Sequence, residues 1–222
     1  MKFLFSLFFF YFVFYSDNTW ADNYIASYKI KTNGVLIGYL DWNLSKEDDS
    51  YAFNIELKSK GFLSKLFVFK GSYSAIGNIN NKEIIPSEYF QIWKTNKKER
   101  EVKIFFRNNK IFGLMQSPKE QEALRINLDS LNNYSDPLSS FLMLLNGSTE
   151  SKTIDGRRVY TFSLYGQQGN EKKYIIENFT NLWADHKRNN LNYISFDNSD
   201  SQFLPNSIYI SLKGRLFKVL ID

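Results

Sequence analysis

Few side chains in this sequence could carry out catalysis. The 222 residues include one histidine, His186, and no cysteine. Thiol catalysis, cysteine-based zinc sites and metal sites with several histidine ligands are therefore excluded. A serine hydrolase would need His186 beside a serine and an acid, but no Gly-x-Ser-x-Gly motif occurs. We interpret His186 as an exposed loop residue and predict a non-enzymatic protein without a metal or cofactor.

Two adjacent arginines are the best candidates for binding chemistry. They lie in Asp155-Gly156-Arg157-Arg158, where Asp-Gly is typical of a tight turn between strands. Two guanidinium groups at a hairpin could hold a phosphate or carboxylate headgroup. In the structural alternative, which we favour, one arginine pairs with a nearby acid such as Asp136 or Asp155. Arg157 and Arg158 both stay candidate ligand-binding residues.

Alternating apolar residues predict the strands that position these side chains. The clearest alternating runs are Tyr51, Phe53, Ile55 and Leu57, then Val102, Ile104 and Phe106, then Tyr160, Phe162 and Leu164. The residue types are mainly aromatic and β-branched, which suits a half-buried pleated surface. Short turn signals such as Asn33-Gly34 and Lys213-Gly214 separate the runs and imply antiparallel neighbours. We expect a mainly β chain of roughly ten strands.

One segment has a clear helix pattern. Asp136 can cap its start, Pro137 fits the first turn, and Asn146-Gly147 ends it. Its apolar stripe consists of Leu138, Phe141, Leu142 and Leu145, at positions i, i+3, i+4 and i+7. We expect this helix on the concave face of the sheet, where Phe141 and Leu145 are candidate ligand contacts.

A second apolar stretch, Gly61 to Phe69, does not alternate. It fits a short helix or a loop that leads into a strand at Phe69. It could serve as a lid, as a loop that dips into a membrane, or as ordinary core. Phe62, Leu63 and Phe67 are further candidate ligand-binding residues.

The first residues predict export. Met1-Lys2 is followed by an apolar run from Phe3 to Tyr15, interrupted by Ser6, and Ala21 suits the position before a cleavage site. The run is shorter than the roughly 20 residues that span a bilayer. We expect a signal peptide over residues 1–21 and one domain over 22–222. Without a cysteine at the cut there is no lipid anchor, so we expect a periplasmic protein.

The charge pattern limits the partners. The net charge is +5, and the lysines and arginines are scattered and do not form one basic face. Together with export, this excludes nucleic acid as the expected partner. Peripheral contact with an anionic lipid surface is compatible with this charge pattern, because the protein is mildly basic. We expect a monomer.

Several short stretches resemble a known family when taken in order. They are Tyr28, Gly34 to Gly38, Gly61-Phe62-Leu63, Lys70-Gly71-Ser72-Tyr73, Pro86-Ser87-Glu88-Tyr89, Arg100-Glu101-Val102, Ser117-Pro118, Leu204-Pro205 and Gly214. The most specific are Asp136-Pro137-Leu138-Ser139-Ser140 and Asp155-Gly156-Arg157-Arg158-Val159-Tyr160. The chain thus resembles the bacterial exported family called domain of unknown function 3108.

The resemblance implies a fold and a type of ligand. Family members often carry one cysteine before the Asp-Gly-Arg-Arg turn and one after it, and this chain has neither. The family is similar in expected shape to the lipoprotein localisation factors, whose curved antiparallel sheets hold acyl chains in an apolar interior. The resemblance therefore implies a strongly curved antiparallel sheet, or half-barrel, with one or two helices on its concave face. Fold likeness alone does not assign function.

These observations suggest three candidate functions. The first is a non-enzymatic periplasmic protein that binds a lipid-like or apolar ligand in the concave face of its sheet. That face could equally be a solid core filled by the helix over 138–145. The second is a structural or assembly module that pairs with another envelope protein through a sheet edge or the Phe62–Phe69 loop. The third, a hydrolase dependent on His186, is the least favoured.

Overall fold

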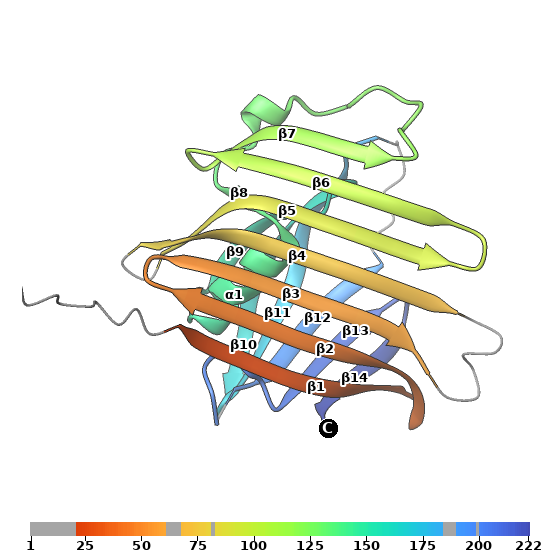
Figure 1. Ribbon diagram of the computed structural model, residues 1–222, viewed down its shortest axis with the longest axis vertical. Coiled ribbons are helices and arrows are strands. Elements are labelled where there is room, and N and C mark those ends of the chain that lie inside the picture. Colours follow the sequence, from red (N-terminus) through yellow and green to blue (C-terminus); the bar gives the residue numbers. More distant parts are fainter. Residues whose placement is uncertain (1–20, 61–67, 81–82, 184–189, 199) are drawn as a thin grey trace, which may run out of the picture.

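The computed structural model describes residues 21–60, 68–80, 83–183, 190–198 and 200–222. These residues form one 14-stranded sheet in the order β7-β6-β5-β4-β3-β2-β1-β14-β13-β12-β11-β10-β9-β8. In Figure 1, β1 to β7 form one layer and the later strands cross behind it, so the sheet is nearly closed into a barrel. The strands are β1 (Asp22–Thr32), β2 (Val35–Glu47), β3 (Ser50–Ser59), β4 (Phe69–Asn80), β5 (Glu83–Thr95), β6 (Glu99–Arg107), β7 (Lys110–Ser117), β8 (Tyr134–Ser135), β9 (Glu150–Ile154), β10 (Arg158–Gln168), β11 (Glu171–Asn181), β12 (Leu191–Asp197), β13 (Ser207–Leu212) and β14 (Arg215–Ile221).

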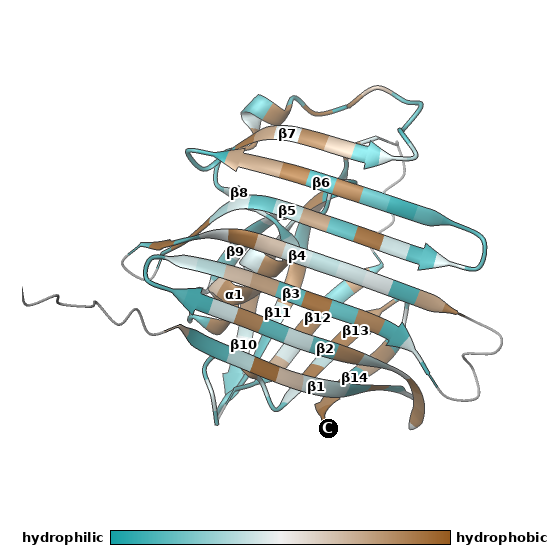
Figure 2. Ribbon diagram, in the orientation of Figure 1, coloured by the Kyte–Doolittle hydropathy of each residue, from teal (hydrophilic) through white to brown (hydrophobic). Residues whose placement is uncertain are grey.

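The mainly β class is confirmed, and the alternation that predicted it is visible in the burial. Tyr51 and Phe53 on β3 are buried, and so are Val102, Ile104 and Phe106 on β6. The side chains between them face outward, because successive residues of a strand point to opposite faces. Figure 2 shows the resulting mixture of hydrophilic and hydrophobic residues along each strand.

Two details of the predicted sheet are corrected. The described residues form fourteen strands, more than the roughly ten expected, and β8 pairs with β9 in parallel, not antiparallel. β8 has two residues and β9 has five. Both strands are too short for an alternating pattern to be recognised in the sequence. The sheet also curves further than the half-barrel that we expected, since its two ends approach each other (Figure 1).

Register shifts help to explain this curvature. They occur at six places, which are Ile30/Lys31, Ile76/Gly77, Phe105/Phe106, Val159/Thr161, Leu164/Gly166 and Leu191/Tyr193. A bulge adds a residue to one strand, bends it and increases the local twist. At Gly77 a side chain would collide with the Ile85 carbonyl oxygen and with Tyr51, so glycine is required there.

The predicted helix is confirmed as α1 (Pro137–Leu145), and it lies between the two layers (Figure 1). Asp136 is its N-cap, and Gly147, with φ of +99°, follows its end. The helix is buried on more than the predicted stripe, because Ser139, Ser140 and Leu144 are buried as well. A second helical element, η2 (Leu128–Ser130), is one turn of 3-10 helix. Within the described residues, no helix is long and apolar enough to span a membrane.

Candidate functional site

The Asp155–Arg158 segment forms the turn that its sequence predicts. Asp155 Oδ1 accepts hydrogen bonds from the backbone N–H groups of Arg157, at 2.9 Å, and Arg158, at 2.8 Å. Gly156 has φ of +86°, in the left-handed region that favours glycine. The aspartate therefore fixes the turn between β9 and β10 through the two residues that follow the glycine.

This turn attaches one end of the sheet to the other. The Gly156 carbonyl oxygen accepts hydrogen bonds from Trp183 Nε1, at 3.1 Å, and from Gln116 Nε2 on β7. A side chain at position 156 would collide with Val102 on β6. Because β6 and β7 are at one end of the strand order and β9 and β10 near the other, these contacts nearly close the barrel.

Both arginines of the turn form ion pairs. Arg158 Nη1 lies 3.7 Å from Asp155 Oδ2, and Arg157 pairs with Glu120 in the segment after β7. Burial raises the pKa of the Asp155 carboxyl, while Arg158 and the two backbone N–H groups act in the opposite direction. The partner Asp155 was anticipated from the sequence, and Glu120 was not, because it is distant in the chain and no pattern connects it to the turn.

A polar cleft of about 190 Å³ opens beside the turn. It is lined by Gln91, Trp93, Arg100, Glu101, Val102, Gln116, Ser117, Pro118, Asp155, Arg157 and Arg158. Arg100 was missed as a site residue, although the alternation with Val102 and Ile104 already places it on the inward face of β6. The cleft thus combines three arginines from two regions of the sequence.

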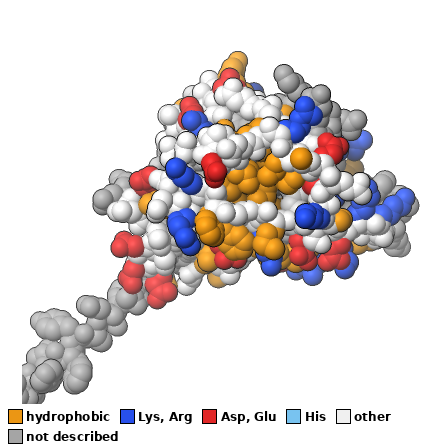
Figure 3. Space-filling model, turned by 90° about the horizontal axis from the view of Figure 1, so that it is seen from above, with side chains coloured by type: hydrophobic (Ala, Val, Ile, Leu, Met, Phe, Trp, Pro, Cys, Tyr) orange, Lys and Arg blue, Asp and Glu red, His pale blue; other side chains and the backbone are white. Residues whose placement is uncertain are grey.

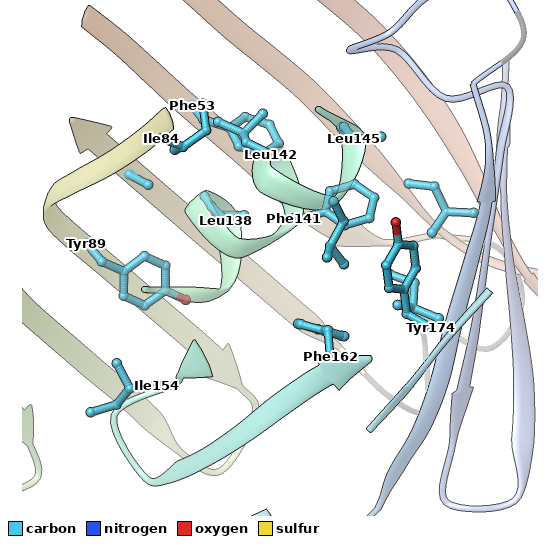
Figure 4. Close-up of a cluster of buried hydrophobic side chains, with 14 of the residues drawn as sticks. Phe53, Ile84, Tyr89, Leu138, Phe141, Leu142, Leu145, Ile154, Phe162 and Tyr174 are labelled. Carbon is cyan, nitrogen blue, oxygen red and sulfur yellow. The ribbon is translucent and has the colours of Figure 1, made fainter. Parts of the chain in front are cut away.

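The predicted apolar contacts lie elsewhere, in the packed interior. Phe141 and Leu145 on α1 are buried, and the Phe141 ring centre lies 5.9 Å from Trp42 and 5.3 Å from Phe196. Figure 4 shows Phe141 and Leu145 among the other core side chains of both layers. The arginines of the turn do not join this cluster, so the predicted residues do not form one site. Phe62, Leu63, Phe67 and His186 lie outside the described residues.

A buried polar network anchors α1 to the sheet. Asp136 Oδ1 accepts from the N–H groups of Leu138 and Ser139, both at 2.9 Å, and its Oδ2 accepts from Ser139 Oγ. Tyr51 Oη lies 2.6 Å from Ser139 Oγ. Burial raises the pKa of Asp136 to about 6, although these hydrogen bonds act to lower it. The network has the features of a structural anchor: a capped helix start joined to β3.

Among the described residues, two buried side-chain polar atoms have no hydrogen-bond partner. They are Tyr28 Oη and Trp42 Nε1, on residues that are 0% and 1% exposed. Burial of an unpaired donor costs about 1–3 kcal/mol. In the part of the chain that the structure describes, no group of three or more His, Cys, Asp or Glu residues could hold a metal ion.

Comparison with known families identifies the family of this chain. A family model described as a protein of unknown function (DUF3108) matches residues 24–181. The chain belongs to the DUF3108 family. The matched range extends from β1 to the end of β11 and includes α1 and the Asp155–Arg158 turn. No curated protein matches the chain.

The solved structures include a similar fold. The crystal structure of a beta-barrel-like protein of domain of unknown function DUF1849 from Brucella abortus aligns with a TM-score of 0.53. The alignment covers 90% of this DUF3108 chain and 95% of the other, at 11% sequence identity. At this identity the likeness shows the barrel-like fold alone.

Proposed function

We propose that this chain is a non-enzymatic periplasmic protein of the cell envelope, and that it acts by binding another envelope protein through its outer surface. The packed interior supports this proposal. Buried aromatic side chains fill the interior, and they are Phe141 on α1 together with Trp42, Phe53 and Phe196 on the sheet. They occupy the space where an acyl chain would otherwise lie. With the interior occupied in this way, the exposed apolar residues become the better candidates for contact.

The proposed contact surface is the outer face of β7. Phe112 and Met115 are 66% and 60% exposed, and β7 is the terminal strand of the sheet. Figure 3 shows the end of the molecule at which β7 lies in Figure 1, with hydrophobic side chains gathered among polar and charged ones. Exposed apolar clusters rimmed by polar residues are typical of interaction sites.

Cations surround the two apolar side chains. The Arg107 guanidinium lies 4.3 Å from the Phe112 ring centre, and Lys103 is the cross-strand neighbour of Met115. Lys110 begins the same strand. We therefore propose a partner segment that combines apolar with acidic side chains, since opposite charge favours encounter and fixes orientation.

Site-specific crosslinking in cells tests this surface. A photoreactive phenylalanine analogue is introduced in place of Phe112 or Met115, and in a control in place of Tyr165, which is 69% exposed on β10. One protein adduct that is common to positions 112 and 115 and absent at 165 supports the proposal. No protein adduct at 112 and 115, or the same adducts at all three positions, contradicts it.

A lipid-like or apolar ligand in the concave face is the second candidate. The unpartnered Tyr28 Oη and Trp42 Nε1 favour it, because a ligand with a polar group could satisfy both donors. Such a ligand would have to displace part of α1 from between the layers. Mass spectrometry of the gently purified mature protein tests this candidate: a stoichiometric lipid supports it, and the absence of both lipid and apolar-dye uptake contradicts it.

A further inference from the structure

The cleft beside the Asp155–Arg158 turn brings together three guanidinium groups from different parts of the chain. Arg157 and Arg158 come from the turn, and Arg100 comes from the inward face of β6. Arg100 is the cross-strand neighbour of Trp93, whose side chain lies on the same face of β5 and also lines the cleft. The arrangement therefore depends on the contact between the two ends of the sheet.

The charges in the cleft are unevenly compensated. Arg157 is paired with Glu120 and Arg158 with Asp155. Among the residues that the structure describes, Arg100 forms no ion pair within 4.0 Å. Glu101 also lines the cleft, but it follows Arg100 on β6, so the strand alternation directs its side chain to the opposite face. Within the described part of the chain, one positive charge in this partly enclosed space thus has no ion-pair partner.

A neutral donor lies near these cations. The Tyr89 hydroxyl donates to Gln91 Oε1 at 3.0 Å, so the amide oxygen of Gln91 is occupied. No described residue accepts a hydrogen bond from the Gln91 N–H groups, which are therefore left for a ligand. Tyr89 is fully buried, which fixes its position and through it the orientation of Gln91. Gln116, by contrast, uses its amide N–H on the Gly156 carbonyl oxygen.

The charges around Arg157 also favour a bound anion. Burial lowers the pKa of Arg157, and the nearby positive charges of Arg100 and Arg158 lower it further. The Arg157 guanidinium is therefore close enough to Arg100 and to Arg158 to be repelled by both. A bound anion would relieve that repulsion and accept charge-assisted hydrogen bonds.

We propose that this cleft binds a phosphate group, held by Arg100 together with Arg157, Arg158 and the Gln91 amide. Planar guanidinium groups match the oxygens of phosphate in pairs, which favours arginine over lysine at such sites. The volume of about 190 Å³ is below the roughly 300 Å³ at which sites for drug-sized ligands begin. It admits a headgroup-sized anion but no acyl chain. This site is separate from the β7 surface and does not depend on it.

Titration of the mature protein with inorganic phosphate tests the site. Trp93 lines the cleft, so its fluorescence provides the signal, and calorimetry provides an independent one. We expect saturable binding with a Kd of about 1 mM or tighter. Sodium chloride at matched ionic strength should leave the signal unchanged, because general screening does not saturate a site. Absence of saturable binding, or an equal response to chloride, overturns the proposal.

Substitutions identify the site. We expect Arg100→Gln to weaken phosphate binding at least about tenfold and Arg100→Lys to weaken it less, because lysine keeps the charge but loses the planar fork. Arg215→Gln, at an exposed arginine on β14, should leave the Kd unchanged. Circular dichroism checks that each variant is folded, and if Arg100→Gln is not, Arg100→Lys decides. Equal binding by the Arg100 variants and the wild type overturns the proposal.

Vesicles distinguish the two sources of a phosphate group. The protein is mixed with vesicles of phosphatidylcholine, with or without phosphatidic acid. Binding that requires phosphatidic acid, is displaced by inorganic phosphate and is lost in Arg100→Gln identifies a lipid headgroup. Binding of inorganic phosphate without binding to either vesicle identifies a soluble phosphate. Both results support the site, whereas vesicle binding that Arg100→Gln leaves unchanged counts against it.

Discussion

Val102 on β6 packs directly against Gly156 in the turn between β9 and β10. The strand that carries Val102 and the two strands that the Gly156 turn connects lie near opposite ends of the sheet order. There is no room for a side chain at position 156, and φ of +86° suits only glycine well. This contact, together with the hydrogen bonds of the Gly156 carbonyl oxygen, holds the barrel nearly closed.

The first prediction concerns this contact. We expect Gly156→Ala to lower the free energy of unfolding by about 2–4 kcal/mol, because it combines an unfavourable φ with overpacking against Val102. Urea denaturation measures the loss. The control is Gly169→Ala, at φ of +59° with open space around it, which should cost only about 1–2 kcal/mol. Equal losses in the two variants would show that Val102 does not restrict position 156.

The second prediction concerns the attachment of α1 to β3. Tyr51→Phe removes the hydroxyl that lies 2.6 Å from Ser139 Oγ. Because the lost hydrogen bond is buried, we expect a loss of about 1–2 kcal/mol in the free energy of unfolding. Tyr165→Phe, at an exposed residue, is the matched control and should change stability by less than about 0.5 kcal/mol. An unchanged denaturation midpoint for Tyr51→Phe would contradict a role in anchoring the helix.

The third prediction is a pH dependence from Asp136. Burial raises the pKa of this carboxyl from 3.8 to about 6 in the folded protein, so the folded state holds the proton more tightly than the unfolded state. The resulting stabilisation is fully present below about pH 3.8 and is lost as the pH rises through about 6. Its size is on the order of 3 kcal/mol.

Comparison of two variants isolates this effect. Asp136→Asn keeps a good N-cap but cannot titrate, so its stability should fall less than that of the wild type between pH 4 and pH 7. Asp129→Asn, at an exposed carboxylate, controls for the removal of a charge. Denaturant midpoints across this range provide the measurement. Parallel pH profiles for Asp136→Asn and the wild type would rule out Asp136 as the titrating group.

The fourth prediction concerns the packed interior. We expect Phe141→Ala to lower the free energy of unfolding by about 3–5 kcal/mol, because it leaves a cavity between Trp42 and Phe196. The cavity should also admit an apolar fluorescent dye that the wild type excludes. Phe112→Ala, on the outer face, should have little effect on either measurement. Dye uptake by the wild type equal to that of Phe141→Ala would indicate an existing cavity.

Elements that depend on interactions between residues close in the sequence could be predicted from sequence patterns. The alternation in β3 and β6 gave both strands and their buried faces. Asp136, Pro137 and Gly147 gave both ends of α1, because caps act within one turn of the helix. The Asp155-Gly156 dipeptide gave the turn for the same reason.

Long-range relationships were not accessible in this way. The pairing of Arg157 with Glu120, and the approach of Arg100 to the turn, depend on closure of the sheet. β8 escaped recognition because its two residues pair with β9 only after α1 has turned the chain back. The choice between a cavity and a solid core depended on the volume that α1 fills, which no spacing of residues encodes.

The pairing of β1 with β14 has a consequence for folding. Tyr28 is the register partner of Ile221, so the first and last strands of the described chain are neighbours in the middle of the sheet. The β1–β7 half can form through successive hairpins, but the junction between the halves needs a contact across nearly the whole chain. Such non-local contacts slow folding. We therefore expect this junction to form only after the C-terminal strand has been synthesised, so that a chain truncated before β14 would expose the unpaired edge of β1.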